Sequence, residues 1–311
     1  MSAGRRSITS KSGTAVDDVL IVDWSAAATR KMGSDSIWIS HVEVGAPAVV
    51  KSLVNLPTRA EAFAWLLDCI STAQGRGRRI LCGFDFSLGY AEGYADLLLA
   101  GFGGMPEGAK SAFDATTLIT SNIVTDASNN ANNRFEAAAL INAKTGIALF
   151  WGHPTGQTHA TLSRAKKDLP ANLEPNPLSQ RRITESGLQV ATNWQLYGIG
   201  SVGSQVLTGL PILQKLRAAF PLTGRVWPFE DISSPTSVIF AEVWPTMHAH
   251  PIPGIAVKDA WQVQSQALFF AALANDEERW AALMHPPSWH DLSAQQREAV
   301  VQEEGWILGV M

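Results

Sequence analysis

The chain has 311 residues, of which 46% are hydrophobic and 17% are charged, and its formal net charge is −4 at pH 7. These values exclude global disorder and allow either one large α/β domain or two smaller ones. They also exclude binding of nucleic acid through bulk positive charge, so any basic surface has to be local.

The N-terminus and the cysteines indicate where the protein resides. Residues 1–14 are polar and basic and lack the apolar segment of a secretory signal, and we expect residues 1–17 to be a flexible tail. No apolar run approaches the roughly 20 residues that span a bilayer, so no membrane association is expected. Cys69 and Cys82 are then reduced core residues of a cytoplasmic protein.

The first predicted strand, residues 19–22, is a run of four apolar side chains that leads directly to Asp23. A continuous apolar run of this kind is typical of a strand buried on both faces. Burying an unpaired charge costs several kcal/mol. We therefore expect Asp23 to lie at the exposed end of its strand or to be held by a cation.

The next segments predict an antiparallel meander and a helix. Residues 36–44 alternate between apolar and polar side chains, and residues 48–56 form a third strand after a turn. Thr58 is a candidate N-cap with Glu61 three residues later, which is the pattern of a capping box. The helix ends near Gly75, and a second acid-ended apolar strand, residues 80–86, follows with Asp85.

Residues 90–191 read as a mostly helical insertion over the acid-bearing edge of the sheet. Helices are predicted at 90–102, 111–119 and 134–145, and the loop at 151–177 is long enough to be functional or mobile. Residues 192–275 are predicted to be the second half of the core. Its predicted elements are a helix at 201–219, strands at 225–229 and 238–244, and a helix at 258–273. The first half of the core is residues 18–89, and residues 276–311 are predicted to be a C-terminal helical extension.

Acids recur near the carboxyl ends of the apolar strands and in the first turn of the last core helix. They are Asp23, Asp85, Glu242 and Asp259. Carboxylates at neighbouring strand ends cannot all stay ionised without a cation, and oxygen ligands suit Mg²⁺ or Mn²⁺. These four residues are therefore the predicted catalytic and metal-binding set. The alternative is structural: Asp23 caps the following turn, and Glu242 pairs with Arg225 or Lys258.

Residues 198–203 match the dinucleotide-binding pattern G-x-G-x-x-G, but they lack the buried strand before it and the acid about 20 residues later. We expect instead that these glycines let a loop and a helix N-terminus approach the acids, where backbone amides could hold a phosphate. Other candidates flank the acids or lie in the insertion. The predicted substrate contacts are Ser25, Ser87, Arg134, His153, Gly200, Ser201 and Lys258.

Short motifs carry a resemblance to a known family. They are V-D-W-S at 22–25, G-F-D-F-S-L-G at 83–89, A-E-V-W-P at 241–245 and K-D-A at 258–260. Together with the order β-β-β-α-β-α-β-α they resemble the ribonuclease H-like fold and, more narrowly, the DUF429 family of predicted ribonuclease H-like nucleases. The resemblance covers residues 18–88 and 196–274 and implies that the four acids are the family's acidic residues. The chain departs from the family pattern after Asp85, where Phe86 and Ser87 replace an apolar–proline pair.

The acids and the resemblance predict a metal-dependent phosphodiester hydrolase of the nuclease type. Its substrate would contain phosphate, as a nucleic acid or a nucleotide does. One alternative is a nucleotide-binding phosphotransferase of the related actin and sugar-kinase architecture, although residues 25–28 lack the glycines of its phosphate loop. Another is a non-catalytic binding or assembly protein with the same fold. The sequence indicates no oligomeric state.

Overall fold

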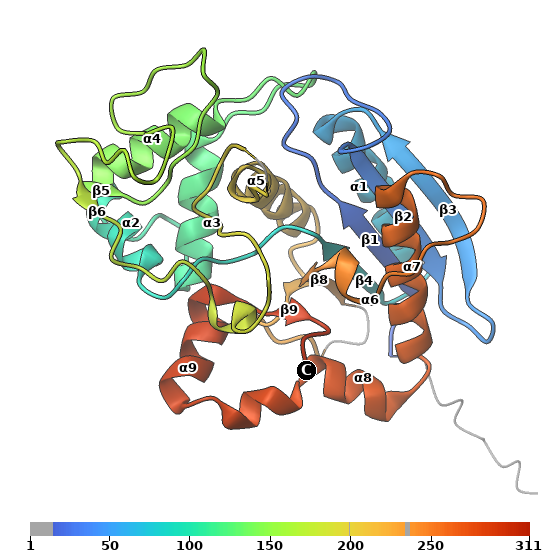
Figure 1. Cartoon of the computed structure of the whole chain (residues 1–311). Coiled ribbons are helices and arrows are strands. Elements are labelled where there is room, and N and C mark those ends of the chain that lie inside the picture. The colour runs from blue at the N-terminus through green and yellow to red at the C-terminus, as the bar shows by residue number, and fades with distance from the viewer. Residues whose placement is uncertain (1–14, 199, 234–236) are drawn as a thin grey trace, which may run out of the picture.

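The computed structural model describes residues 15–198, 200–233 and 237–311. Its centre is a mixed sheet with the order β3-β2-β1-β4-β8-β7, and β9 pairs with the same edge of β8 as β7 (Figure 1). The strands are β1 (Asp18–Asp23), β2 (Ile37–Glu43), β3 (Val49–Leu56), β4 (Ile80–Phe84), β7 (Gly224–Val226), β8 (Val238–Val243) and β9 (Ile307–Leu308).

The pairing directions confirm the predicted topology. β1, β2 and β3 form an antiparallel meander, and β1, β4 and β8 run parallel to one another. The three apolar strands that precede Asp23, Asp85 and Glu242 are therefore neighbours in one sheet. This order and these directions match the ribonuclease H-like topology.

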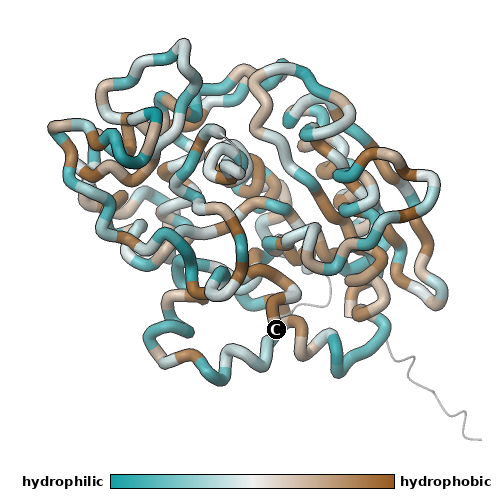
Figure 2. The backbone as a smooth tube through the Cα atoms, in the orientation of Figure 1, coloured by the Kyte–Doolittle hydropathy of each residue, from teal (hydrophilic) through white to brown (hydrophobic). Residues whose placement is uncertain are grey.

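Alternation along the central strands sends their side chains to two separate cores. Leu20 and Val22 of β1 pack in the core that contains α1 (Arg59–Gly75) and α5 (Gly203–Ala219). Val19 and Ile21 pack in the other core, against α7 (Lys258–Leu273). Both faces of the sheet are thus covered, which explains why the central strands read as continuous apolar runs. In Figure 2 the central strands contain hydrophobic stretches, and many of the outer loops are hydrophilic.

The predicted N-cap, which is one half of the predicted capping box, explains where α1 begins. Thr58 is the N-cap, and its hydroxyl accepts the backbone N–H of Glu61 at 3.1 Å. The side chains of Ala62, Leu66 and Ile70 recur at helical spacing and are buried. Burial of this stripe against the sheet fixes the helix in place, because an isolated helix of this length is only marginally stable in water.

The insertion is helical, as predicted, and lies to one side of the sheet (Figure 1). Tyr90 and Tyr94 of the insertion pack against Trp194 of the core segment that follows it, with 4.3 Å between the ring centroids of the two tyrosines. The predicted mobility of residues 151–177 stays a prediction. The elements of this region are α2 (Tyr94–Phe102), α3 (Ala112–Ile123), α4 (Arg134–Thr145), β5 (Ile147–Ala148), β6 (Glu174–Pro175) and the 3₁₀ helix η1 (Ile183–Glu185).

The last segment of the chain returns to the sheet. The sequence predicted only helices after residue 276, but β9 pairs in parallel with Glu242 and Val243 of β8. No helix among the residues that the structure describes has the length and apolar character needed to cross a bilayer. The remaining elements are α6 (Pro245–His248), α8 (Glu277–Met284), the 3₁₀ helix η2 (Pro287–Asp291), α9 (Ala294–Ala299) and the π-helix η3 (Val300–Glu304).

The π-helix η3 attaches this last segment to the insertion. The Glu303 carboxylate accepts the backbone N–H groups of Gly93 and Ala95 at the start of α2, at 2.9 and 2.5 Å. The Glu304 carboxylate accepts those of Glu92 and Ile183 at 2.9 and 2.6 Å. Two glutamates from the end of the chain thus satisfy amide groups at helix starts that have no partner within their own helix.

Gly89 lets the chain after β4 pass directly over η3. A β-carbon at this position would lie 2.1 Å from the carbonyl oxygen of Glu303 and 2.6 Å from that of Glu304. We expect Gly89→Ala to lower the free energy of unfolding by about 1–3 kcal/mol, because backbone atoms cannot move aside cheaply. Urea denaturation measures this change.

Gly75→Ala is the matched control, because a β-carbon there meets no atom within 4 Å and the residue ends α1. Its free energy of unfolding should stay the same or rise by less than about 1 kcal/mol. Equal losses for the two variants would contradict the close contact with η3.

Candidate functional site

The register of the parallel strands decides which acids meet. Val22 of β1 lies opposite Phe84, and Phe84 lies opposite Glu242. Asp23 and Asp85 therefore continue the pairing side by side at the carboxyl ends of β1 and β4. Glu242 lies one residue earlier along its strand, so alternation points its side chain to the opposite face of the sheet.

Asp23 and Asp85 form a hydrogen-bonded carboxyl pair. Each keeps partial exposure at the sheet edge, but the protein around them removes much of their hydration. This desolvation, together with the charge of Asp85 and a hydrogen bond to it, raises the pKa of Asp23 well above its ordinary value. Desolvation raises the pKa of Asp85 to about 6, against the hydrogen bonds that lower it. One of those bonds comes from the backbone N–H of Trp24, which donates to Asp85 Oδ1 at 2.7 Å.

Asp259 lies in the first turn of α7 and lines the same cavity as Asp23, and its charge contributes to the raised pKa of Asp23. Its Oδ2 atom accepts the backbone N–H of Asp35 at 2.7 Å. Asp35 has a φ of +52°, and its carboxylate also acts on Asp23. That carboxylate is exposed and pairs with Lys31 at 3.2 Å. The loop before β2 thus brings a further acid and a cation to the site.

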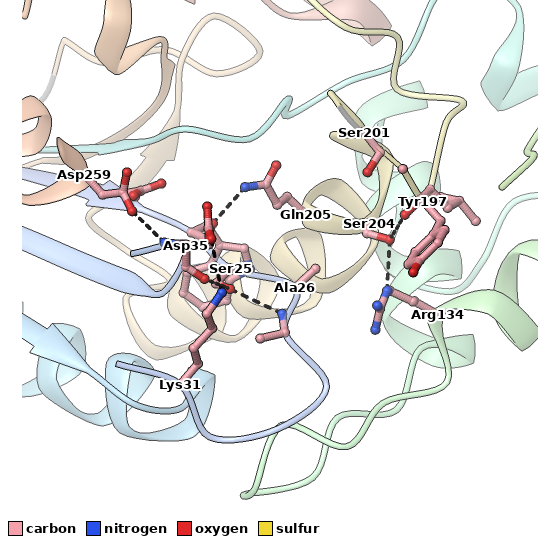
Figure 3. A pocket seen from close by; sticks show the side chains of 15 residues that line it. Ser25, Ala26, Lys31, Asp35, Arg134, Tyr197, Ser201, Ser204, Gln205 and Asp259 are labelled. Atoms are coloured by element: carbon pink, nitrogen blue, oxygen red, sulfur yellow. Dashed lines mark hydrogen bonds and ion pairs between the residues drawn. The ribbon is translucent and has the colours of Figure 1, made fainter. Parts of the chain in front are cut away.

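A cavity of about 640 Å³ opens beside these acids. Asp35, Asp259 and Lys31 lie on one side of it, and Arg134 and Tyr197 lie on the other, with Gln205 between the two groups (Figure 3). The size lies within the range of small-molecule sites. The lining residues are Asp23, Trp24, Ser25, Ala26, Ala27, Lys31, Asp35, Arg134, Leu196, Tyr197, Gly198, Ser201, Ser204, Gln205 and Asp259.

Arg134 supplies the positive charge on the far side of the cavity. Its Nε donates to the Ser204 hydroxyl at 2.9 Å, and its Nη1 donates to Asn132 Oδ1 at 2.8 Å. The guanidinium lies 4.4 Å from the centroid of the Phe135 ring. Burial and the nearby charge of Arg59 lower the pKa of Arg134 to about 10, which leaves it protonated at neutral pH.

The glycine motif positions the N-terminus of α5 beside Arg134. A β-carbon on Gly203 would lie 2.2 Å from the Asn193 carbonyl oxygen, so this position requires glycine. The chain before the motif contributes only an isolated bridge between Trp151 and Gln195, and no strand. The arrangement fits the expected close approach of a loop and a helix start and lacks the strand that a dinucleotide-binding unit requires.

A second arginine, Arg59, fixes the loop that follows β1. Arg59 is fully buried, and its guanidinium donates to the carbonyl oxygens of Ser25 and Ala27, each at 2.9 Å. The same guanidinium binds both oxygens of Asp126, at 2.5 and 2.7 Å, and the carbonyl oxygen of Asn130 at 2.8 Å. It therefore ties the acid side of the cavity to the part of the insertion that leads into Arg134.

Glu242 does not join the other acids, which corrects the predicted set. Its carboxylate is buried and pairs with Arg182 through distances of 2.6 and 2.7 Å. It also accepts the backbone N–H of Leu88 at 3.1 Å. Desolvation raises the pKa of Glu242 despite this pairing. The contacts agree with the structural alternative for Glu242, except that its partner is Arg182 in place of Arg225 or Lys258.

Four of the predicted substrate contacts do not line the cavity: Ser87, His153, Lys258 and Gly200, the last of which is the chain neighbour of the lining residue Ser201. Ser87 belongs to the Glu242 network, since its hydroxyl donates to Asn193 Oδ1 at 2.9 Å and accepts Arg182 Nη2 at 3.0 Å. His153 is buried in the insertion, with Nδ1 2.9 Å from the Pro154 carbonyl oxygen. Lys258 is exposed at the start of α7. These residues were predicted as contacts because they are close to an acid in the sequence or lie in a predicted loop. Neither criterion decides the direction of a side chain.

The other predicted contacts are at the cavity. Ser25, Arg134 and Ser201 line it, and Gly200, with a φ of +75°, lies next to Ser201. The sequence reasoning missed further lining residues, among them Lys31, Asp35, Tyr197, Ser204 and Gln205. Of these, only Ser204 and Gln205 had a signal, because they directly follow the glycine motif at a predicted helix start.

The carboxylates at the cavity could hold a metal ion only if water or a substrate supplied the other ligands. Within the described ranges, no group of three or more His, Cys, Asp and Glu side chains is arranged to hold one. Mg²⁺, however, commonly keeps several waters and binds through one or two carboxylates plus the phosphates of a substrate. Asp23 and Asp85 supply two adjacent carboxylates that repel each other when ionised. Their chemistry fits such a two-carboxylate site and does not fit a closed cage.

Comparison of the chain with protein-family models, with curated proteins and with solved structures finds no match. The assignment of the fold therefore depends on the order and direction of the strands. The assignment of the site depends on the contacts of its own residues.

The carboxyl pair makes stability depend on pH in a defined direction. A carboxyl whose folded pKa is raised stabilises the fold at low pH, and this contribution is lost as pH rises through the folded pKa. The wild type should therefore lose stability as pH rises from about 4 through 6 and above. Asp23→Asn removes one charge and keeps a donor for Asp85, so at pH 8 it should raise the free energy of unfolding by about 1–3 kcal/mol.

Thermal melting at pH 5 and at pH 8 in EDTA measures this difference, and the gain should be smaller at pH 5. Asp68→Asn, which changes an exposed acid of α1, is the control and should show no such pH dependence. Destabilisation by Asp23→Asn at both pH values would mean that Asp23 is a structural acceptor.

The Arg182 pairs are expected to be essential to folding. Arg182→Met leaves Glu242 and Glu185 buried without their shared cation. Removing one partner of a buried pair typically costs about 3–5 kcal/mol. Arg279→Met breaks an exposed pair with Asp276 at 3.4 Å and should change stability by less than about 0.5 kcal/mol. Similar chemical denaturation midpoints for the two variants would refute a structural role for Arg182.

Proposed function

We propose that this chain is a metal-dependent hydrolase of phosphodiesters, with its site in the 640 Å³ cavity. The observation that carries the proposal is the hydrogen-bonded Asp23–Asp85 pair at the sheet edge, with Arg134 across the same cavity. Carboxylates on one side suit a divalent cation, and a guanidinium on the other suits a phosphate.

Asp23 and Asp85 are the residues that would hold Mg²⁺ or Mn²⁺. Burial and mutual repulsion disfavour the doubly ionised pair, and a divalent cation removes that penalty. When bound, such an ion lowers the pKa of a water and stabilises charge on phosphoryl oxygens. Glu242 has no part in this set, because Arg182 already neutralises it.

The other cavity residues have separate roles in the proposal. Arg134, held by Ser204, would bind a phosphate oxygen, and the N-terminus of α5 adds backbone donors on the same side. Asp259 is oriented by its bond from the Asp35 N–H and would accept the proton of the attacking water. This assignment retains three of the four acids that the family resemblance implies, and membership of that family stays a prediction.

The net charge of −4 favours a compact substrate over long duplex DNA. Binding of a duplex usually needs several phosphate contacts by basic side chains. The cavity offers Arg134 and Lys31, and Lys31 is already paired with Asp35. This small number of basic side chains is suited to a substrate with one or two phosphates, such as a nucleotide or the end of a strand.

Hydrolysis of bis(para-nitrophenyl) phosphate in Mg²⁺ or Mn²⁺ tests the proposal. Asp23→Asn should lower kcat/KM by at least about 100-fold, and Arg134→Gln should lower it by roughly tenfold or more. Asp68→Asn is the matched control for loss of one acid, and it should keep wild-type activity.

Titration calorimetry with Mg²⁺ alone separates metal binding from turnover. The wild type should bind the ion at pH 8, and Asp23→Asn should not. Activity that persists in EDTA would instead assign the pair to metal-free acid–base catalysis. The absence of both metal binding and turnover would favour the non-catalytic alternative.

A further inference from the structure

Away from the large cavity, three side chains from three separate elements form a chain of hydrogen bonds. The Sγ atom of Cys69 lies 3.6 Å from His41 Nδ1, and His41 Nε2 lies 2.8 Å from Asp18 Oδ1. A nucleophile within reach of a base, with the base held by a third group, is the arrangement in which proteins activate a nucleophile. None of the three residues lines the large cavity.

The alternation of the strands explains why these residues meet. Leu20 of β1 and Ile39 of β2 pack in the core that contains α1, and residues two apart along a strand share a face. Asp18 and His41 therefore lie on the face that α1 covers. Cys69 belongs to α1 and packs against the same core. The tertiary fold brings the three together, because 23 residues separate Asp18 from His41 and 28 separate His41 from Cys69.

Asp18 determines which ring nitrogen of His41 can accept a proton. Desolvation acts to raise the pKa of this buried carboxyl, but hydrogen bonds from His41 and Arg78, and their charges, lower it overall. An ionised carboxylate only accepts hydrogen bonds, so His41 Nε2 carries a hydrogen. In the neutral imidazole Nδ1 then has the free lone pair, and this atom lies beside the thiol.

Cys69 is partly exposed, but its thiol needs a base in order to react. Cys82, by contrast, is fully buried. Burial, together with the charges of Asp18 and Asp68, raises the pKa of Cys69 to about 11. At neutral pH little thiolate therefore forms by loss of the proton to water, and the thiolate is the reactive form. Transfer of the proton to His41 is the route that the geometry offers, because an adjacent imidazolium stabilises a thiolate.

We propose that Cys69 is a modification site that forms a mixed disulfide with a low-molecular-weight disulfide, with His41 as its base and Asp18 as the positioning residue. The thiol proton passes to His41 Nδ1, and the Asp18 carboxylate stabilises the imidazolium. The Cys69 sulfur attacks one sulfur of the disulfide, whose S–S bond breaks. The leaving thiolate takes the proton from His41, so one disulfide and one thiol give a new disulfide and a new thiol. The inference is independent of the function proposed for the large cavity.

Reaction of the full chain with 4,4′-dithiodipyridine tests the proposal, with the released thiopyridone followed by absorbance. Mass spectrometry should place the adduct on Cys69, and Cys69→Ala should abolish the reaction of the folded chain. His41→Gln should lower the second-order rate constant at neutral pH by at least about tenfold, because a positioned base typically contributes about 100-fold or more. His250→Gln, which removes an exposed histidine, is the matched control and should leave the rate unchanged.

The pH profile distinguishes a base from a histidine that only supports the fold. In the wild type the rate constant should level off below about pH 9, because the proton passes to His41 and not to water. In His41→Gln it should rise by about tenfold per pH unit up to about pH 10, as the thiol ionises. The other charged groups around the cluster are the same in both proteins, and they are Asp17, Glu43, Lys51, Asp68 and Arg78.

Asp18→Asn keeps an acceptor for His41 Nε2 and removes the charge that stabilises the imidazolium, so it should lower the plateau of the profile by about tenfold. Thermal melting shows whether each variant folds. Equal rate constants for the wild type and a folded His41→Gln would overturn the proposal, as would an adduct on Cys82 alone or a folded chain that does not react. If His41→Gln does not fold, the wild-type profile decides, because a rate that rises without levelling off would mean that Cys69 reacts without a base.

Discussion

The buried ion pair between Arg182 and Glu242 joins parts of the chain that are far apart in sequence. Arg182 belongs to the insertion and Glu242 to the central strand β8, and the same guanidinium binds Glu185 and the carbonyl oxygen of Glu304. Each of these groups would be costly to bury alone. The insertion, the sheet and the end of the chain therefore have to assemble together. The pair also fixes the turn after Asp85, because Glu242 accepts the Leu88 N–H.

Arg59 has the corresponding role at the other end of the site. It joins the loop after β1 to the turn that precedes Arg134, through bonds to Ser25 and Asp126. Arg59 thus fixes the relative position of the acid side and the basic side of the cavity. A rigid separation matters for the proposed chemistry, because catalytic groups that are misplaced by about 1 Å can lose roughly 100-fold in rate.

The fold could be predicted because its signals are local. Apolar runs that end in acids, an alternating meander and the N-cap Thr58 each specify one element, and their order selects the topology. The composition of the site could not be predicted to the same degree. A shift of one residue along β8 decides whether Glu242 or Val243 shares the face of Asp85, and the partner Arg182 lies 60 residues away in the chain. Asp35 reached the site through a loop whose path no periodicity describes.

The charge balance at the sheet edge explains why the pKa values of the acid pair are raised. The largest influences on the Asp23 carboxyl, after desolvation, are the other acids Asp85, Asp259 and Asp35. Among the described lining residues, the cations are Lys31, which pairs with Asp35, and Arg134, which lies on the far side of the cavity. Only a proton or an added cation can then neutralise the pair. As pH rises through the folded pKa values the proton is lost from two carboxylates that the register of β1 and β4 holds together, and under the proposed function a divalent cation would then balance their charge.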